Sequence, residues 1–275
     1  MAAETHVLVT GSTGNLGEKA VAALRAVDGV RVSRIGRDAS GAPDVIAADL
    51  AIWDRAWAAS FAGVDAVLHL AADPRPIATW ESVARLNVDL SLNVLRAAEE
   101  GRVARFVFAS SNWVLGGYRF ARDRLAADTP PRPVNPYGAS KLLIERVGLA
   151  QAARTGMAFL SLRIGYCQPG ENRPGPHMAF GRWGQEMWLS NEDWAAAVVR
   201  ACTSPHAESA VLNIMSRNEG MRWDLEAARR AIGYVPVSQH VPRLTAGSWL
   251  RERLAQVRDA VFPQMSSTPR FGSRW

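Results

Sequence analysis

Short apolar runs alternate with helical patterns along most of the chain. The apolar runs have the length of buried strands and lie at residues 6–11, 30–36, 44–50, 65–72, 105–111, 158–165 and 210–216. Segments with apolar residues at helical spacing lie at residues 15–27, 53–63, 80–100, 137–153 and 192–204. Strands separated by helix-length segments form parallel βαβ units with right-handed crossovers. The pattern therefore predicts an α/β fold with a doubly wound parallel sheet.

Two stretches break this alternation. Residues 167–188 are rich in Gly, Pro and Arg and have the length of a functional loop. After residue 217 the order of apolar and polar positions becomes irregular. The expected division is a dinucleotide-binding domain at 1–165 plus 190–216 and a small C-terminal substrate-covering lobe at 166–189 plus 217–275.

A glycine-rich turn, "TGSTGNLG", lies between the first predicted strand and the first predicted helix. Glycine lets the backbone approach a pyrophosphate closely, and the helix N-terminus supplies free N–H donors. This context indicates a Rossmann-type nucleotide site, although such a turn also serves helix–sheet packing alone. The cofactor contacts expected from it are Gly11, Thr13, Gly14, Asn15, Leu16 and Gly17.

The end of the second predicted strand decides how the adenosine ribose is recognised. An acidic residue there favours NAD, whereas an arginine pairs with the 2′-phosphate of NADP. The sequence has Arg37 at this strand end, with Arg34 nearby and Asp38 next. We therefore favour NADP and keep NAD, bound through Asp38, as the alternative. Asp49 and Leu50 end the third strand, where we expect the adenine ring.

One of only two lysines lies four residues after a tyrosine, so that Tyr137 and Lys141 share one helix face. Asn135 and Pro136 supply the N-cap and first-turn signals of that helix. A lysine cation stabilises a phenolate and lowers the tyrosine pKa, which suits a general acid–base, and it can reach the nicotinamide ribose. The alternative is an ordinary exposed helix turn.

A third group is needed to hold a substrate oxygen, and Ser110 and Ser111 end the predicted strand at 105–111. Together with the glycines, the tyrosine and the lysine, they resemble the extended short-chain dehydrogenase/reductase superfamily, which is NAD(P)-dependent epimerase/dehydratase-like. The resemblance spans residues 5–216. It is carried by "TGSTGNLG", "DAVLHLAA", "ARLNVDLSLNVLRAA", "FVFASSN" and "YGASK".

The resemblance implies roles for individual residues. Ser111 is then the catalytic serine, Tyr137 the acid–base and Lys141 its partner. Asn87 matches an asparagine that supports the lysine through water; the alternative is a hydrogen bond inside the helix. Further residues that the resemblance places along the cofactor are Ala71, Ala72, Asn87, Tyr137, Lys141 and Ile164.

The segments "FVFASSNWVLGGY", "LRIGYCQPGEN" and "MWLSNEDW" are similar to the uronate dehydrogenase family. That family oxidises the C1 hemiacetal of glucuronate or galacturonate to a lactone. The likeness implies an NAD(P)-dependent sugar dehydrogenase with Asn112 on the substrate. Trp113, Tyr166 and Arg37 depart from the residues usual in that family. The expected substrate contacts are Ser111, Asn112, Trp113, Tyr137, Tyr166, Arg173 and Arg182.

We expect the substrate to be a cyclic sugar, in particular an acidic one such as a uronate or a sulfo-sugar. Arg173 and Arg182 offer planar donor forks that match a carboxylate or sulfonate. Trp113 and Trp183 offer flat faces for a sugar ring. In the alternative reading, the arginines keep a flexible loop solvated and the tryptophans pack in the core.

Three other functions are compatible with these residues. An NDP-sugar epimerase or dehydratase would share Ser111, Tyr137 and Lys141, but it needs a larger C-terminal lobe than this chain offers. A carbonyl reductase would use the tryptophans to bind a bulky aromatic ketone. A non-catalytic NADP-binding relative commonly lacks the Tyr–Lys pair, which this chain keeps.

Composition narrows the range of partners. The net charge is +6, but no run of five basic residues occurs, so we expect a solvated arginine-rich surface and no nucleic-acid binding. Two cysteines provide neither a disulfide framework nor a metal-ligand spacing, so no metal site is expected. With no uncharged stretch of membrane-spanning length and no secretory leader, we expect a cytoplasmic protein.

The segments 80–100 and 137–153 show apolar positions beyond one core-facing stripe. We therefore expect these two helices to form the interface of a homodimer or a higher homo-oligomer. The apolar residues that suggest it include Leu90, Leu92, Leu142 and Leu143.

Overall fold

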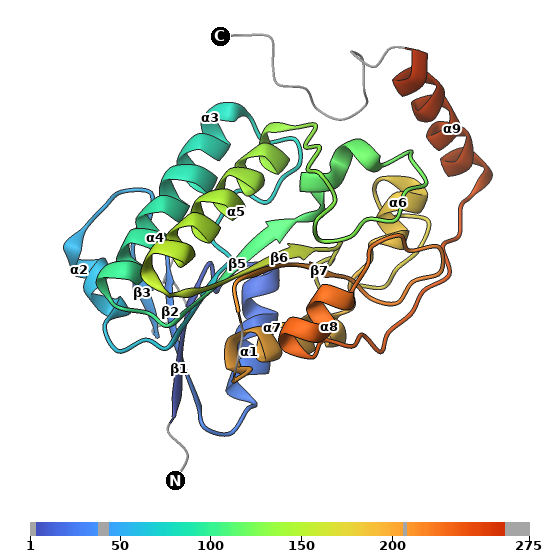
Figure 1. The fold of residues 1–275 in the computed structure, drawn as a ribbon. Coiled ribbons are helices and arrows are strands. Elements are labelled where there is room, and N and C mark those ends of the chain that lie inside the picture. Colours follow the sequence, from blue (N-terminus) through green and yellow to red (C-terminus); the bar gives the residue numbers. More distant parts are fainter. Residues whose placement is uncertain (1–3, 38–43, 206–207, 262–275) are drawn as a thin grey trace.

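Seven parallel strands form one sheet in the computed structural model, which describes residues 4–37, 44–205 and 208–261 (Figure 1). The strands are β1 (Thr5–Thr10), β2 (Val30–Gly36), β3 (Val45–Ala47), β4 (Ala66–His69), β5 (Arg105–Ser111), β6 (Ala158–Ile164) and β7 (Ala210–Ile214). Their order is β3-β2-β1-β4-β5-β6-β7, and all neighbouring pairs are parallel. The chain winds outward in both directions from β1 and β4, which confirms the predicted doubly wound Rossmann-type fold.

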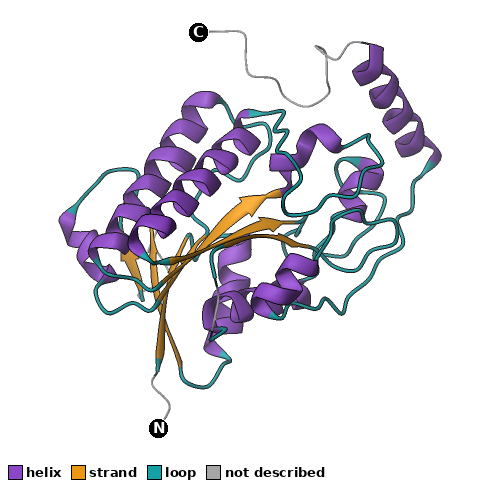
Figure 2. Ribbon diagram, viewed as in Figure 1, coloured by secondary structure: helices purple, strands orange, loops and turns teal. Residues whose placement is uncertain are grey.

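Helices cover both faces of this sheet (Figures 1 and 2). One face carries α1 (Asn15–Arg25), α7 (Asn191–Thr203) and α8 (Glu226–Ile232). The opposite face carries α2 (Arg55–Ala58), α4 (Leu90–Glu100) and α5 (Pro136–Thr155). Because both faces are covered, the strands are apolar along most of their length, as the sequence pattern indicates.

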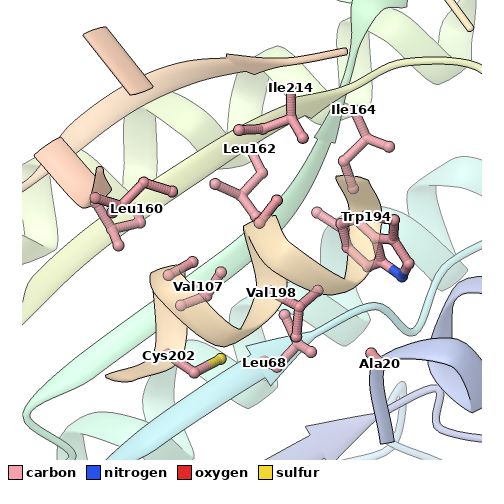
Figure 3. Packing of buried hydrophobic residues seen from close by; sticks show 14 of the residues in the cluster. Ala20, Leu68, Val107, Leu160, Leu162, Ile164, Trp194, Val198, Cys202 and Ile214 are labelled. Atoms are coloured by element: carbon pink, nitrogen blue, oxygen red, sulfur yellow. The ribbon is translucent and has the colours of Figure 1, made fainter. Parts of the chain in front are cut away.

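The core between the sheet and α7 is close-packed (Figure 3). Trp194 and Val198 of α7 lie against Val107 of β5 and Leu162 of β6, and all four side chains are buried. Fully burying a large apolar side chain contributes roughly 1.5–3 kcal/mol. On the opposite face of the sheet, Phe159 stacks on both Phe106 and Phe108.

The helix expected at 80–100 is continuous but not uniform. It consists of α3 (Trp80–Val83), a π-helical stretch η2 (Ala84–Asp89) and α4, and Asn87 lies in the π-helical stretch. Periodicity does not reveal such a stretch, because one extra residue per turn hardly alters a long apolar pattern. The helix expected at 53–63 is shorter and divides into α2 and the 3₁₀ turn η1 (Ala59–Phe61).

The C-terminal part is more regular than its sequence pattern suggests. After residue 217, where the sequence pattern becomes irregular, the chain forms α8 and α9 (Ala246–Val261). Two shorter elements are α6 (Gly181–Glu186), within the loop expected at 167–188, and the 3₁₀ segment η3 (Asn112–Tyr118). Residues of α8 pack in the same cluster as β6 and β7. The division into a dinucleotide-binding domain and a small C-terminal lobe stays a prediction.

The outer surfaces of the helices bear on possible partners. Leu90 is buried at the start of α4 and Leu142 is half-buried, whereas Leu92 and Leu143 are exposed. The dimer interface stays a prediction, and only the two exposed leucines are fully available to it. Within the described part of the chain, no helix has the length and apolar character needed to cross a bilayer.

Candidate active site

A cavity of about 830 Å³ opens at the carboxyl ends of the strands, the edge at which parallel sheets bind ligands. The predicted site residues in its lining are Gly11, Thr13, Gly14, Asn15, Leu16, Gly17, Arg37, Leu50, Ala71, Ala72, Ser111, Asn112, Trp113, Tyr137, Lys141, Ile164 and Tyr166. Those outside its lining are Asp49, Asn87, Arg173 and Arg182. A second cavity of about 580 Å³ lies beside α8 and contains none of the predicted residues.

The three glycines of the β1–α1 turn differ in how close a Cβ atom at each position would come to neighbouring backbone atoms. Gly11 has φ +65°, and a Cβ there would lie 2.6 Å from the amide nitrogen of Ala71. A Cβ on Gly17 would lie 2.2 Å from the carbonyl oxygen of Gly11. At Gly14, in contrast, a Cβ would meet nothing nearer than 3.5 Å. The fold itself therefore requires Gly11 and Gly17, whereas Gly14 leaves space on the cavity side for a ligand to approach the backbone.

The start of α1 is tied to the segment that follows β6. Asn15 donates from Nδ2 to the carbonyl oxygen of Cys167 at 3.0 Å. Lys19 donates from Nζ to the carbonyl oxygen of Gln168 at 2.7 Å. These bonds join chain segments about 150 residues apart, and they hold the glycine turn against the neighbouring loop.

The strand ends beside the glycine turn hold the residues expected near the adenosine. Arg37 is exposed at the end of β2, and Leu50 is buried in the cavity lining. Asp49 instead pairs with Arg85 at 2.6 Å, outside the lining. Asp38, the residue expected to select NAD in the alternative reading, lies outside the described residues.

Helix α5 begins as the sequence predicts. The Asn135 side chain accepts a hydrogen bond from the Gly138 amide at 2.7 Å, and Pro136 occupies the first turn. A Cβ on Gly138 would lie 2.4 Å from the carbonyl oxygen of Trp113, so this glycine allows α5 to touch the segment that follows β5. That close approach brings Tyr137 beside Ser111.

Burial dominates the electrostatics of the Tyr–Lys pair. It raises the pKa of Tyr137 to about 12, a hydrogen bond to Ser111 opposes the shift, and the Asp73 carboxylate adds to it. Burial also lowers the pKa of Lys141 to about 7. Desolvation thus disfavours the charged form of both groups, and the expected effect of the lysine on the tyrosine pKa stays a prediction.

Asn87 lies behind the cavity wall. Its side chain accepts from the Asp73 amide at 2.7 Å and donates to the Asp73 carbonyl at 3.2 Å. It also donates to Ser140 Oγ at 3.1 Å, one residue before Lys141. These hydrogen bonds leave Asn87's own helix and join the segment after β4 to α5, so they are not the bond inside the helix named as the alternative, and the support of Lys141 through water stays a prediction.

The segments after β5 and β6 bring polar and aromatic groups into the cavity. Asn112 donates to the Ile164 carbonyl at 3.1 Å, while its buried Oδ1 has no hydrogen-bond partner among the described residues. Trp113 and Tyr166 line the cavity. Trp183 does not, because it packs against Trp113 with ring centroids 5.3 Å apart. The interpretation of Trp183 as a flat face for a sugar is therefore wrong, and core packing explains this residue.

Neither arginine of the 167–188 loop reaches the cavity lining. Arg173 is exposed and pairs with Glu171 at 2.7 Å. Arg182 is exposed in α6, where its backbone amide donates to Glu252. Loop composition did not reveal this placement, because side-chain direction depends on contacts made far along the chain.

Sequence reasoning missed Arg75, which lines the cavity after β4. Its guanidinium donates from Nε and Nη2 to the carboxylate of Asp73, at 2.9 and 2.7 Å. This hydrogen-bonded ion pair lowers the pKa of Asp73 to about 2. A usable signal was present, since segments that directly follow parallel strands line the ligand site.

Sequence reasoning also missed Glu145, one turn beyond Lys141 on α5. Its buried carboxylate pairs with Arg163 of β6 at 2.8 Å and accepts from the hydroxyl groups of Ser110 and Ser161. These contacts tie α5 to the ends of β5 and β6. The spacing of four residues from Lys141 was the available signal.

Comparisons with known proteins agree with this architecture. Residues 7–168 match the NAD dependent epimerase/dehydratase family. An L-arabinose 1-dehydrogenase (NAD(P)(+)) of Haloferax volcanii is 35% identical over 247 residues, which cover 84% of this chain and 96% of that protein. A uronate dehydrogenase of Pseudomonas putida is 32% identical over 238 residues, which cover 84% of this chain and 83% of that protein.

Among solved structures, a glucuronic acid dehydrogenase of Chromohalobacter salexigens superposes with a TM-score of 0.73 at 25% identity. The superposition covers 96% of this chain and 90% of that one. The family match extends over more than half of the chain, and the curated relatives align over most of it. The chain therefore belongs to the NAD dependent epimerase/dehydratase family, of the extended short-chain dehydrogenase/reductase type that its motifs predict.

Proposed function

We propose that this protein is an NAD(P)-dependent sugar dehydrogenase that oxidises a cyclic sugar at its C1 hydroxyl. The observation that carries the proposal is the convergence of Ser111, Tyr137 and Lys141 in the cavity that also contains the glycine turn. The relatives support it, because their names describe dehydrogenases of L-arabinose and of uronates. A fold alone does not specify an activity, so the proposal depends on this site.

In the proposed reaction, Ser111 donates a hydrogen bond to the C1 oxygen of the sugar. Tyr137 accepts the hydroxyl proton while the hydrogen on C1 leaves with its electron pair, so that the hemiacetal becomes a lactone. Lys141, on the same face of α5, stabilises the phenolate form of Tyr137. A bound nicotinamide cofactor supplies the acceptor for the hydride.

The cavity suits such a cofactor in shape and charge. The space beside Gly14 lets a pyrophosphate approach the N-terminus of α1, where backbone N–H groups are free to donate. Arg37 lies at the strand end expected to meet the adenosine ribose, so NADP is the favoured cofactor and NAD the alternative. Among the described residues of the lining none is acidic, which suits a ligand with several phosphate charges.

We further propose that the sugar carries an acidic group, as a uronate or a sulfo-sugar does. The basic and non-acidic lining of the cavity supports an anionic substrate. The free acceptor at Asn112 Oδ1 suits a sugar hydroxyl, since a buried acceptor without a donor is costly. Because Arg173 and Arg182 lie outside the lining, they contribute no support to this part of the proposal.

A substrate panel tests the proposed function. Neutral aldoses, uronates, sulfo-sugars and sugar phosphates are each incubated with NAD and with NADP, and reduced nicotinamide is followed by its absorbance. We expect cofactor reduction with at least one cyclic aldose or its acid, and a lactone or aldonic product. Tightly retained cofactor without net reduction would instead favour the epimerase or dehydratase reading. Turnover of aromatic ketones alone would favour a carbonyl reductase.

A further inference from the structure

Few basic side chains line the cavity and could bind an anionic group of a ligand. Its basic side chains, among the described residues, are Arg37, Arg75 and Lys141. Arg37 lies at the end of β2, and Lys141 is buried beside Tyr137. Arg75 is the remaining cation, and it lies on the segment after β4, which continues directly from Ala71 and Ala72 of the same lining.

The Arg75 side chain is held in a defined orientation. Asp73 accepts two hydrogen bonds from the guanidinium and one from the Arg75 amide, at 3.1 Å. Ser82 fixes the same carboxylate at 2.6 Å. The Asp73 side chain is only 4% exposed, whereas that of Arg75 is 65% exposed. The negative end of the pair is therefore buried in the protein, and the positive end is open.

One edge of the guanidinium is still available to a ligand. The bonds to Asp73 use Nε and Nη2, and within the described residues no hydrogen bond is made by Nη1. An arginine has five N–H donors in a rigid plane, so an Asp-bound guanidinium keeps donors for a second oxyanion. The contact with Asp73 also reduces the rotamer freedom that an incoming anion would otherwise have to restrict.

The same network connects Arg75 to the Tyr–Lys helix. Asn87 binds the backbone of Asp73 on one side and Ser140 Oγ on the other. Ser140 lies on α5 between Tyr137 and Lys141, and its hydroxyl donates to the Tyr137 carbonyl at 2.8 Å. Arg75 and Tyr137 are thus held in a fixed relation, as two-point recognition of one small substrate requires.

We infer that Arg75 is the specificity-determining residue of this site and binds an anionic group of the substrate, remote from the carbon that is oxidised. The inference rests on the proposed sugar oxidation, and it names the residue that recognises the acid. A carboxylate, sulfonate or phosphate shares the required chemistry, namely oxygens that accept charge-assisted hydrogen bonds from Nη1 and Nη2.

Arg173 provides a matched control. Arg75 and Arg173 are both exposed, and each pairs with a carboxylate two residues earlier in the chain. Only Arg75 lines the cavity. The variants are Arg75→Ala, Arg75→Gln and Arg173→Ala. The glutamine variant keeps one donor for Asp73, so it guards against misfolding caused by an unpaired buried carboxylate.

The experiment compares KM and kcat at saturating cofactor for a hexuronate, a hexose 6-phosphate and the neutral hexose. Both Arg75 variants should raise KM for the preferred anionic sugar about ten- to a hundredfold, the loss expected for charge-assisted hydrogen bonds. KM for the neutral hexose and for the cofactor should hardly change. Arg173→Ala should resemble the wild type, and the two acidic sugars separate a carboxylate site from a phosphate site.

Two results would overturn the inference. One is an equal loss for acidic and neutral sugars, and the other is a weakened affinity for the cofactor alone. Calorimetric titration of a hexuronate into protein saturated with cofactor gives a readout that needs no turnover. If no sugar is oxidised, the proposed function fails. The role of Arg75 then depends only on whether its variants bind the hexuronate more weakly than the wild type in this titration. If neutral sugars are oxidised without any preference for acids, the function stands and Arg75 is excluded.

Discussion

The two halves of the cavity are built by different means. The proposed cofactor half, at the β1–α1 turn and the ends of β2 and β3, is formed largely by backbone. The proposed substrate half, after β4, β5 and β6, is formed by side chains from distant segments, such as Arg75, Asn112 and Tyr166. Backbone geometry determines which residues fit in the first half, whereas side-chain packing determines the shape of the second.

We expect this difference to decide which positions can change without loss of the fold. A glycine turn leaves few solutions, because a Cβ on Gly11 or Gly17 would collide with backbone atoms. We expect the substrate half to tolerate substitution better, since side chains and not closely packed backbone form its lining. Relatives with different sugar names are compatible with this division.

The largest expected effect is on the chemical step. Tyr137→Phe removes the proposed proton acceptor while keeping the ring that packs beside Trp113 and Met187. We expect kcat to fall by about 10²–10⁴, the usual contribution of a positioned acid–base. Cofactor affinity, measured by titration, should stay close to that of the wild type. A variant that turns over at nearly the normal rate would remove Tyr137 from the mechanism.

Substitutions at Gly17 and Gly14 are expected to have smaller effects, on stability and on cofactor affinity respectively. They test the proposed cofactor half directly. Gly17→Ala places a Cβ 2.2 Å from the Gly11 carbonyl oxygen and should lower the free energy of unfolding by about 2–3 kcal/mol. Gly14→Ala meets nothing nearer than 3.5 Å and should change stability by less than about 1 kcal/mol.

The Gly14 variant should instead weaken cofactor binding on the order of tenfold, equivalent to about 1.4 kcal/mol. Urea unfolding and cofactor titration of both variants separate the two effects. Equal destabilisation by the two substitutions, with unchanged cofactor affinity for Gly14→Ala, would contradict the different roles given to these glycines.

The last prediction concerns cofactor choice and is of a size comparable to the effect on cofactor binding. Arg37→Asp exchanges a cation that pairs with a 2′-phosphate for an acid that accepts from ribose hydroxyls. We expect the ratio of kcat/KM for NADP over NAD to fall about ten- to a hundredfold. The control is Asn112→Ala, a substitution in the substrate half of the cavity, which should leave the ratio of kcat/KM for the two cofactors unaltered. A wild type that already prefers NAD strongly would show that Arg37 does not select the cofactor.

The parts of the fold with local signals could be predicted from the sequence. β2 and β5 occupy the predicted residues, and α5 has its predicted cap at Asn135. The π-helical turn around Asn87 could not be predicted, because hydrogen bonds to Asp73 and Ser140 accompany it and neither is local. Helix α8 was missed because its apolar face is short and is completed by β7 and α7.

The same distinction between local and distant contacts applies to the residues of the candidate site. Residues with a fixed relation to a strand end, such as Ser111 and Arg37, lie in the cavity where the sequence places them. Arg173 and Arg182 do not, because Arg173 pairs with Glu171 inside the 167–188 loop and the backbone of Arg182 is bound by Glu252 of α9. Burial, which raises the pKa of Tyr137, is likewise a property of the whole fold and cannot be read from the Tyr–Lys spacing.

The buried pair of Glu145 and Arg163 has a consequence for recombination between relatives. Removing one partner of a buried ion pair commonly costs about 3–5 kcal/mol, because the other charge is left without compensation. A chimera with a crossover between these positions inherits the two charges from different parents. Crossovers are therefore best placed outside residues 110–163. Ser110, Ser161 and both charged residues then come from the same parent.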